Sequence, residues 1–387
     1  MNDNLDRFVG TLGKQQASEL RDSRRNVEIN VGKSCNNKCV FCLDGMPSNE
    51  DKKFIDFEAM KAELTRFRAE GFESVGFLGG EPTTYSKIGE SIALARELGY
   101  SRIALATNAM MFRRLAFVDE LLGAGLTRVT ISMHGHTAAL EDKLTAVPGG
   151  FEKKCEAIRN LQRRQKEGAL TDGLSVNIVL NGWNYRALPK MLRFFFETMG
   201  LADLRVNFIR PEGYAVGSAD LTPTLTDVVP VLMKAVLLNE YHFKKELSFG
   251  GVPLCVFPRE FLANKSVLER YLGDVYRDLS TSCSIRTEGV DTGVARTEDG
   301  RSRFNWQDRK RYDLKEKPER CGRCRLDQAC EGLWMGYVDI YGSAELSPLL
   351  WDAGKLGRET PLPAQPPAPK SSAQPEKLPR RLTVLSV

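Results

Sequence analysis

Three cysteines near the amino terminus carry the strongest chemical signal in the chain. Cys35, Cys39 and Cys42 are separated by three and then two residues, in the segment Cys-Asn-Asn-Lys-Cys-Val-Phe-Cys. Three thiolates on one short loop suit an iron–sulfur cluster with four irons, because one iron then keeps a position for a non-protein ligand. A structural zinc site is closed by four protein ligands and leaves no such position. We therefore expect a reactive cluster here, with a zinc knuckle or a chance clustering of thiols as the alternative.

A glycine-rich loop follows an apolar run at 74–78 and forms the second motif. It reads Gly79-Gly80-Glu81-Pro82. The two glycines allow the backbone to approach a ligand closely, because they have no Cβ and can adopt torsion angles closed to other residues. The glutamate places a negative charge beside that backbone, and the proline fixes the exit of the chain. Such a loop can hold an ammonium group, although an ordinary strand-to-helix turn would account for the motif taken alone.

The two motifs together resemble the radical S-adenosylmethionine (SAM) superfamily. The resemblance implies a 4Fe–4S cluster on Cys35, Cys39 and Cys42, with SAM bound to the open iron and its amino group held by the loop at 79–82. Phe41 also matches the pattern, and we expect it near the adenine of SAM rather than in the core. An enzyme of this kind cleaves SAM reductively to a 5′-deoxyadenosyl radical, which then abstracts a hydrogen from the substrate.

Strand and helix patterns alternate through the first two-thirds of the chain. Apolar runs rich in branched residues, typical of strands buried on both faces, occupy 27–32, 74–78, 102–106, 128–133, 174–180 and 204–209. Helical patterns lie between them at 57–69, 88–98, 113–123, 151–166 and 186–199. This alternation predicts an α/β fold with parallel strands and right-handed crossovers. The resemblance narrows it to a partial (β/α)6 TIM barrel with a smaller cysteine-rich carboxyl-terminal domain.

The chain divides into four expected parts. They are an amino-terminal arm at 1–25, the radical SAM barrel at 26–215, an auxiliary domain at 216–350 and a proline-rich tail at 351–387. The tail cannot form a packed core with its composition, so we expect it to be disordered.

Polar residues stand at the carboxyl ends of the expected strands, where ligands of parallel α/β folds gather. The resemblance implies SAM contacts at the ends of the third, fourth and fifth strands, from Thr107, Asn108, Ser132, Val179 and Asn181. Ala109 replaces the glycine of the family's Thr-Asn-Gly, and Arg210 after the sixth strand could face SAM or substrate. For each of these residues, an ordinary place in a strand-end turn is the alternative.

His134 and His136 form the one histidine cluster in a chain with three histidines. We expect an alternating pair at a strand end to aim both rings the same way. His134 is a candidate substrate contact or proton donor. A loop histidine that is hydrogen-bonded to its own surroundings is the commoner case and is weighed against it.

A second cysteine group lies in the last third of the chain. Cys321 and Cys324 form a Cys-x-x-Cys pair, and Cys330 follows six residues later. The group resembles the auxiliary-cluster extensions, of the SPASM and twitch types, that cap many radical SAM barrels. The resemblance implies a second 4Fe–4S cluster with Cys255 as the fourth ligand and Cys283 as its competitor. A zinc site with the same ligands is the alternative.

Composition points to a cytoplasmic protein. The chain has nine cysteines, and both the odd number and the tight clusters that some of them form argue against a disulfide framework. Neither a signal peptide nor an 18-residue apolar run is found in the sequence, so we expect no membrane association. The net charge is +5, but residues 301–325 contain ten Lys or Arg against four Asp or Glu. That stretch is either a solvated loop or a site for phosphate or an acidic peptide; nucleic acid is the less favoured partner.

The class of substrate can be predicted only by comparing the architecture of this chain with that of related enzymes. The cysteine-rich ending resembles that of peptide maturases, so modification of a ribosomally made precursor peptide is the leading hypothesis. The alternative is a small molecule such as a sugar, nucleoside or cofactor precursor. We also expect an electron donor such as flavodoxin or ferredoxin. A non-catalytic iron–sulfur or zinc protein is the third possibility, and it would require the Gly-Gly-Glu-Pro loop to be accidental.

Overall fold

The computed structural model describes residues 24–45, 53–272, 281–284, 303–327 and 329–350. The tail at 351–387 and nearly all of the amino-terminal arm at 1–25 lie outside these ranges. One compact unit ends at Leu349 and a second begins at Leu350. No division falls near residue 215, so the boundary between barrel and auxiliary domain stays a prediction.

A nine-stranded sheet in the order β7-β6-β5-β4-β3-β2-β1-β8-β9 forms the framework. The strands β1 to β7 are parallel and lie in chain order: Asn26–Asn30, Ser74–Leu78, Arg102–Thr107, Arg128–Ser132, Gly173–Leu180, Asp203–Phe208 and Glu246–Gly250. β8 (Thr281–Ser284) pairs parallel to β1, and β9 (Arg303–Asn305) pairs antiparallel to β8. All six predicted strands are confirmed, and β7 is a seventh parallel strand that the sequence analysis did not predict.

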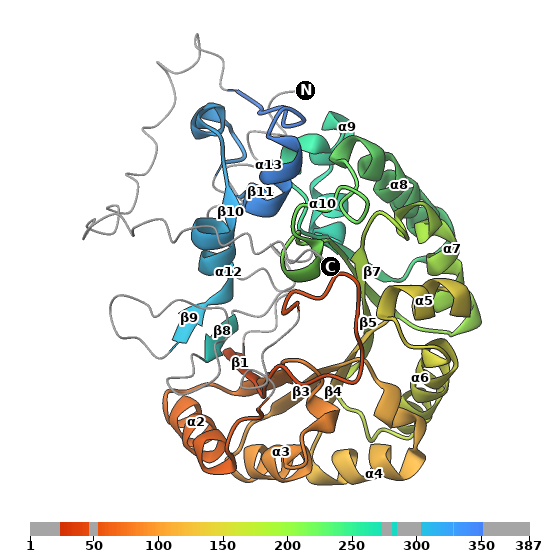
Figure 1. Ribbon diagram of the computed structural model, residues 1–387, viewed down its shortest axis with the longest axis vertical. Helices are drawn as coiled ribbons and strands as arrows, with labels where there is room; N and C mark the ends of the chain where they lie inside the picture. The colour runs from red at the N-terminus through yellow and green to blue at the C-terminus, as the bar shows by residue number, and fades with distance from the viewer. Residues whose placement is uncertain (1–23, 46–52, 273–280, 285–302, 328, 351–387) are drawn as a thin grey trace, which may run out of the picture. The chain divides into compact units, whose positions relative to one another are not determined.

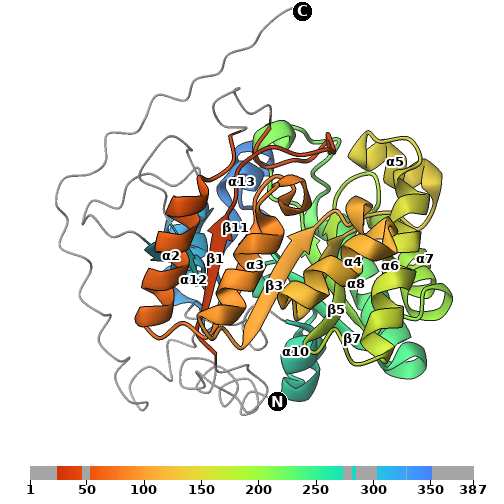
Figure 2. The same cartoon turned by 90° about the horizontal axis from the view of Figure 1, so that it is seen from below.

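The connecting helices lie around the outside of the curved row of strands, as in a partial barrel (Figure 1). They are α2 to α8: Phe57–Ala69, Ile88–Glu97, Leu115–Ala124, Ala138–Thr145, Gly150–Lys166, Leu188–Arg193 and Leu225–Leu238. A π-helical turn at Phe194–Thr198 continues α7. Figure 2 shows α2, α3 and α4 side by side against the strands. This arrangement confirms the α/β class.

The helix α2 illustrates why these segments take their places. The Asp56 side chain accepts hydrogen bonds from the N–H groups of Glu58 and Ala59, which caps the helix. Met60, Leu64 and Phe67 recur at helical spacing and are buried on one face. That face meets the apolar sheet, so burial rather than intrinsic propensity fixes the helix in position.

The carboxyl-terminal segments of the compact unit share one hydrophobic core with the barrel. Their elements are α9 (Arg259–Leu262), α10 (Lys265–Tyr271), α12 (Trp306–Arg309), β10 (Lys315–Glu316), β11 (Leu333–Trp334) and α13 (Met335–Tyr341). β10 and β11 pair as a short antiparallel ribbon. Within the described ranges, every helix is too short or too polar to cross a lipid bilayer.

Candidate active site

The cysteine loop after β1 is held in place by its backbone. The N–H groups of Lys38 and Val40 donate to carbonyl groups at the end of α5, those of Thr145 and Leu144, each at 3.0 Å. On the other side, the Cys42 carbonyl accepts from the N–H of Tyr214 at 3.1 Å. The loop is therefore fixed from two directions before any cofactor is considered.

The three thiols are close enough to influence one another's ionisation. Burial raises the pKa of Cys35 to about 11 and that of Cys39 to about 12, and the neighbouring thiols add to both shifts. Burial also raises the pKa of Cys42. Thiolates crowded into such a place need positive charge beside them, and a metal cluster supplies it. Three cysteines on one fixed loop therefore fit a 4Fe–4S cluster with an open iron.

The glycine loop after β2 packs directly on the chain that leads into Cys35. The N–H of Gly80 donates to the Gly32 carbonyl at 2.6 Å, and the N–H of Glu81 donates to the Ser34 carbonyl at 2.7 Å. A Cβ atom on Gly80 would lie 2.2 Å from the Ser34 oxygen. Gly79 adopts a φ of 144°, and its Cβ would lie 2.4 Å from the Gly32 oxygen. Both glycines are thus needed for contact between the two loops, in addition to any contact with a ligand.

The Glu81 carboxylate joins the ends of β2 and β3. It is 1% exposed. One oxygen accepts from the hydroxyl groups of Thr83 and Thr107, both at 2.6 Å, and the other accepts from the N–H of Asn108 at 2.6 Å. Pro82 starts the short 3-10 helix that carries Thr83. The sequence predicted the charge of Glu81 but not this bridging role; contact of Glu81 with a SAM ammonium group stays a prediction.

The Thr107-Asn108-Ala109 turn reaches back to the cysteine loop. The Asn108 amide donates to the side-chain oxygen of Asn36 at 2.6 Å, and its nitrogen lies 3.9 Å from the Cys35 sulfur. Ala109 has a φ of 64°, in the left-handed region where glycine is usual. The alanine therefore keeps the turn of the Thr-Asn-Gly motif, at a cost in backbone strain.

Phe41 and His134 pack against each other beneath the cysteine loop. Their ring centroids lie 4.8 Å apart at 84°, in an edge-to-face contact. Phe41 is 7% exposed and belongs to the hydrophobic core, so the expectation that it lies outside the core is wrong. The physical reason is the anchoring of the loop by its backbone hydrogen bonds, which leaves this side chain packed against His134.

His134 is buried and uncharged. Burial lowers its pKa to about 4, and its Nδ1 accepts a hydrogen bond from the N–H of Val179 at 3.0 Å. This is the geometry of the alternative case, a histidine bonded to its own surroundings. Both His134 and His136 lie beyond Ser132, the last residue of β4, so the strand alternation expected to aim their rings together does not apply.

A buried ion pair that the sequence analysis missed builds the loop after β4. The Lys154 ammonium lies 2.6 Å from the Glu141 carboxylate, with side chains 1% and 0% exposed. Glu141 also accepts from the N–H groups of His134 and Gly135 at 2.6 and 2.7 Å. Lys154 donates in addition to the carbonyl of Ser132 at 2.8 Å. A signal did exist: Lys154 stands at helical spacing from the buried Ile158 and Leu161 of α6, on an apolar face.

The turn after β5 is closed by asparagines. Asn181 is fully buried, and its side-chain oxygen accepts from the N–H of Trp183 at 2.9 Å. Asn184, which the sequence analysis did not single out, donates to the carbonyls of Val179 and His134 at 2.9 and 3.0 Å. The predicted pair Val179 and Asn181 therefore lies beside His134, and its contact with SAM stays a prediction.

Arg210, after β6, faces the carboxyl-terminal segments. It forms an ion pair with Glu212. Its guanidinium carbon lies 5.4 Å from the ring centroid of Trp334 and 5.9 Å from that of Trp306. Whether Arg210 faces SAM or substrate stays a prediction.

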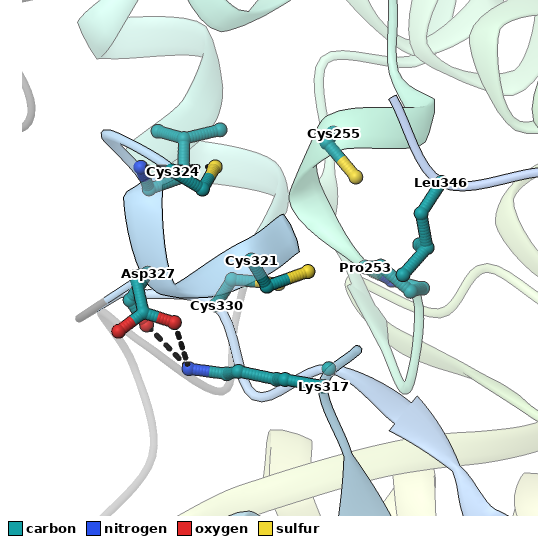
Figure 3. Close-up of a pocket in the computed structure, with 10 residues that line it drawn as sticks. Pro253, Cys255, Lys317, Cys321, Cys324, Asp327, Cys330 and Leu346 are labelled. Carbon is teal, nitrogen blue, oxygen red and sulfur yellow. Dashed lines mark hydrogen bonds and ion pairs between the residues drawn. The ribbon is translucent and has the colours of Figure 1, made fainter. Parts of the chain in front are cut away.

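Four cysteines from two distant segments line one pocket, shown in Figure 3. They are Cys255, Cys321, Cys324 and Cys330. Cys283 lies elsewhere, in β8, where its sulfur is 3.9 Å from the Glu28 carboxylate. Burial and the nearby Cys330 raise the pKa of Cys255 to about 12. The structure therefore brings the predicted four together and separates the competitor. Lining one pocket is not yet a metal site: within the described residues, no group of three or more Cys, His, Asp or Glu side chains is arranged to hold a metal ion, either here or in the cysteine loop after β1.

The curated proteins of similar sequence have names that refer to small-molecule substrates. A probable GTP 3′,8-cyclase of Saccharolobus solfataricus is 27% identical over 226 residues, which are 57% of this chain and 69% of that protein. The protein of the same name from Saccharolobus islandicus strain M.14.25 is 26% identical over 49% of this chain and 58% of its own. A 7,8-dihydro-6-hydroxymethylpterin dimethyltransferase of Methanocaldococcus jannaschii is 32% identical over 28% of this chain and 22% of its own. Each match thus covers only part of the relative.

Solved structures with the same fold cover more of the chain. Streptococcus suis SuiB, bound to S-adenosylmethionine, superposes with a TM-score of 0.57 at 17% identity, over 90% of this chain and 80% of SuiB. The protein anSMEcpe, with bound AdoMet and Cp18Cys peptide, gives 0.52 at 16% identity, over 84% and 93%. At these identities the likeness establishes the fold.

The family is shown for the part of the chain that carries the cysteine and glycine loops. Residues 29–195 match the Radical SAM superfamily, and they include the strand ends that meet around Cys35. Membership implies a 4Fe–4S cluster and SAM as cofactors. Residues 29–195 are therefore a radical SAM superfamily domain, and the solved structures show that the fold continues beyond it.

Proposed function

We propose that this protein modifies a peptide by abstracting a hydrogen atom from it. When bound, a 4Fe–4S cluster and SAM supply the chemistry, reductive cleavage of SAM to a 5′-deoxyadenosyl radical. The observation that carries the proposal is the joining of the three-cysteine loop to the glycine loop and the β3 turn, through Gly80, Glu81 and Asn108.

The residues of the chain contribute position and shielding. Cys35, Cys39 and Cys42 would hold the cluster, and backbone hydrogen bonds anchor the loop that carries them. The buried Glu81 network keeps two strand ends together, so that SAM meets a preformed surface. Phe41 and His134 pack against each other, and such an apolar contact beside the cysteine loop would limit the access of water, which would protect a radical from side reactions.

A second 4Fe–4S cluster is proposed at Cys255, Cys321, Cys324 and Cys330. The support is their convergence on one pocket, although their sequence positions are far apart. Four thiolates close the coordination of such a cluster, which suits electron transfer or structure rather than SAM binding. A zinc ion on the same four ligands is the competing assignment. We further propose a cytoplasmic setting with a flavodoxin- or ferredoxin-type electron donor.

Two substrate classes have separate support. The peptide proposal rests on the likeness to SuiB over 90% of this chain, since SuiB has also been solved bound to its precursor peptide SuiA. The likeness covers more of this chain than the match to the curated relative from Saccharolobus solfataricus, which spans 57% of it. A nucleotide or pterin is the second candidate, because the curated relatives are named for GTP and pterin chemistry.

Iron analysis with matched cysteine variants tests the cofactor proposal. After anaerobic reconstitution, we expect about eight irons per chain and release of 5′-deoxyadenosine from SAM with dithionite. Cys39→Ala should abolish that release. Cys255→Ala should lower iron to about four, whereas Cys283→Ala should leave about eight. Bound zinc, or equal iron in the Cys255 and Cys283 variants, would reject the auxiliary cluster.

Stimulation of 5′-deoxyadenosine release by candidate substrates tests the proposal that the substrate is a peptide. We expect GTP and a dihydropterin to leave the uncoupled rate of 5′-deoxyadenosine release unchanged, and members of a synthetic peptide pool to raise it. The modified peptide should be visible by mass spectrometry. A rate increase with GTP, accompanied by loss of GTP, would replace the peptide with the nucleotide.

A further inference from the structure

The buried ion pair of Glu141 and Lys154 holds three elements of the barrel together. Lys154 in α6 lies 2.6 Å from Glu141 in the neighbouring α5 (Figure 1), and neither side chain is more than 1% exposed. One carboxylate oxygen accepts from Lys154, and the other accepts from the N–H groups of His134 and Gly135. Lys154 also donates to the carbonyl of Ser132, the last residue of β4, at 2.8 Å. The pair therefore joins α5, α6 and the end of β4.

The last turn of α5 carries this arrangement to the cysteine loop. The carbonyls of Thr145 and Leu144 accept from the N–H groups of Lys38 and Val40, each at 3.0 Å. Those two N–H groups lie on either side of Cys39 in the sequence. The ion pair lies one helical turn earlier in the same helix. A shift of α5 would therefore be transmitted to Cys39 through two backbone hydrogen bonds.

Tight packing fixes α5 at this place. A Cβ atom on Gly135 would lie 2.6 Å from the backbone nitrogen of Glu141, so the helix presses directly on the loop after β4. Leu144 and Thr145 are fully buried. A helix of eight residues is marginal on its own, so its position depends on such tertiary contacts. The ion pair is the charged part of those contacts.

The pair has a direction relative to the cysteine loop. Burial is the largest influence on the pKa of the Cys39 thiol and raises it to about 12; among the charged groups Lys154 acts most strongly and lowers it, whereas Glu141 raises it more weakly. At His134 the order is reversed: after burial, which lowers its pKa to about 4, Glu141 has a larger effect than Lys154. Because the effect of a charge falls with distance, the ammonium end is directed at Cys39 and the carboxylate end at His134.

We propose that the pair of Glu141 and Lys154 positions Cys39 and presents its ammonium end to the cluster that Cys39 helps to hold. The inference rests on the cofactor part of the proposed function and is independent of the substrate. Reduction adds one electron and no proton beside three thiolates, so a fixed positive charge at this place favours the reduced form. Lys154 is thus a positioning residue that eases the electron transfer required before SAM is cleaved.

The reduction potential of the reconstituted full-length protein tests the proposal. Dithionite supplies the electron in a potentiometric titration without SAM, and the electron paramagnetic resonance signal of this cluster is the one that Cys39→Ala removes. We expect Lys154→Met to disfavour reduction about tenfold, or about 59 mV for one electron, because the carboxylate stays without its partner. Glu141→Gln should favour reduction by a similar factor, because the ammonium then acts alone. A role limited to folding does not produce shifts of opposite sign.

Two control variants separate the charge of Lys154 from other effects. Lys154→Arg keeps the positive charge and should restore the potential of the unmodified protein. Arg164→Met removes a positive charge from another face of the same helix, where Arg164 forms a surface ion pair with Asp119. Solvent screens that charge, so the potential should not change.

The double variant Glu141→Gln/Lys154→Met covers the case in which a single unpaired charge prevents folding, because it leaves no buried charge without a partner. Its potential should be lower than that of the unmodified protein, since the nearer, positive end of the pair is lost. Hydrogen exchange without the cluster gives a second readout. The amides of Lys38 and Val40 should exchange faster in the double variant than in Arg164→Met.

Three results would overturn the proposal. They are shifts of the same sign in Lys154→Met and Glu141→Gln, a potential of the double variant equal to that of the unmodified protein, and unchanged exchange of the Lys38 and Val40 amides in the double variant. Failure of the proposed function is distinguishable, because it appears in the unmodified protein as absent iron or absent 5′-deoxyadenosine, while the two amides still respond to loss of the pair.

Discussion

Ala109 holds a backbone conformation that suits glycine better, with a φ of 64°. An L-residue in this region costs about 1 kcal/mol, because its Cβ crowds the carbonyl oxygen that follows. We therefore expect Ala109→Gly to raise the free energy of unfolding by up to about 1 kcal/mol. Chemical denaturation of the two proteins measures the difference.

An alanine in ordinary helical geometry provides the control for that substitution. Ala62 is exposed within α2, so Ala62→Gly should lower the free energy of unfolding by about 1 kcal/mol. A loss of stability in both variants would show that the strain at Ala109 is relieved by contacts that glycine cannot make.

His134 should remain neutral over the physiological range. Its pKa of about 4 in the folded protein lies below the ordinary value of 6.5. The unfolded chain therefore binds the proton first, and the contribution of this residue to stability is present above pH 6.5 and is lost as the pH falls toward 4. With three histidines in the chain, 13C-edited NMR should show a His134 signal that does not move above pH 5.

Two further substitutions assign the His134 signal and provide an exposed histidine for comparison. His134→Gln removes it, and His242→Gln removes that of an exposed imidazole that lies 2.6 Å from Glu197. Between pH 7.5 and 5, the unmodified protein should lose about 2 kcal/mol more stability than His134→Gln. A His134 signal that titrates near 6.5 would contradict the buried geometry.

At the scale of single residues, the sequence indicated which side chains are candidate cofactor ligands better than it indicated which residues surround them. The spacing of Cys35, Cys39 and Cys42 is local, and so is the chemistry of a thiol. The bridging role of Glu81 depends on Thr107 and Asn108, which come from another strand. The place of Phe41 depends on His134 in the same way. A single sequence does not say which distant partner a side chain will meet.

The contact between the glycine loop and the cysteine loop is the element-scale feature most open to test. A Cβ at position 80 would lie 2.2 Å from the Ser34 carbonyl oxygen, so Gly80→Ala must push the two loops apart. We expect reconstituted iron to fall by about four per chain, because the loop that carries Cys35 is displaced. Iron and sulfide analysis after reconstitution gives the result.

Gly123 is the matched control. It lies in α4, and a Cβ there would meet nothing within 4 Å. Gly123→Ala should keep the full iron content and raise stability by about 1 kcal/mol, since alanine favours the helix. Full iron loading in Gly80→Ala would mean that the two loops do not depend on each other.

Helices and strands were predicted correctly where the sequence has a regular pattern of apolar residues, and were missed where polar residues interrupt that pattern. The strand at 74–78 and the helix at 57–69 were predicted with the bounds that the structure has, because strong periodicity marks burial. β7 (Glu246–Gly250) and α5 (Ala138–Thr145) were not predicted. β7 contains polar residues and is a strand because it pairs with β6; α5 is short and polar and is capped by Thr137.

For the whole molecule, Tyr337 joins the carboxyl-terminal segments to the barrel. It is 1% exposed, its hydroxyl accepts from the N–H of Leu225 at 3.0 Å, and its ring lies 5.9 Å from that of Phe208 in β6. We expect one calorimetric transition for the compact unit rather than two, and Tyr337→Ala should lower its stability by about 3–5 kcal/mol.

Tyr241, which is 82% exposed, provides the comparison. Tyr241→Ala should change the stability by no more than about 0.5 kcal/mol. Two separate transitions in the unmodified protein, with Tyr337→Ala affecting only one, would instead support independent domains divided near residue 215.

The sequence by itself determined the α/β class, the three-cysteine and glycine motifs and the radical SAM domain that carries them, because each depends on short-range spacing or on periodic burial. Tertiary structure decided which residues from distant segments meet. It places Cys255, and not Cys283, in the pocket of Cys321, Cys324 and Cys330. It also pairs Glu141 with Lys154 in the interior and brings Arg210 close to Trp306 and Trp334. The physical reason is that such contacts depend on how the strands are ordered and how loops pack across them, and no local propensity encodes that arrangement.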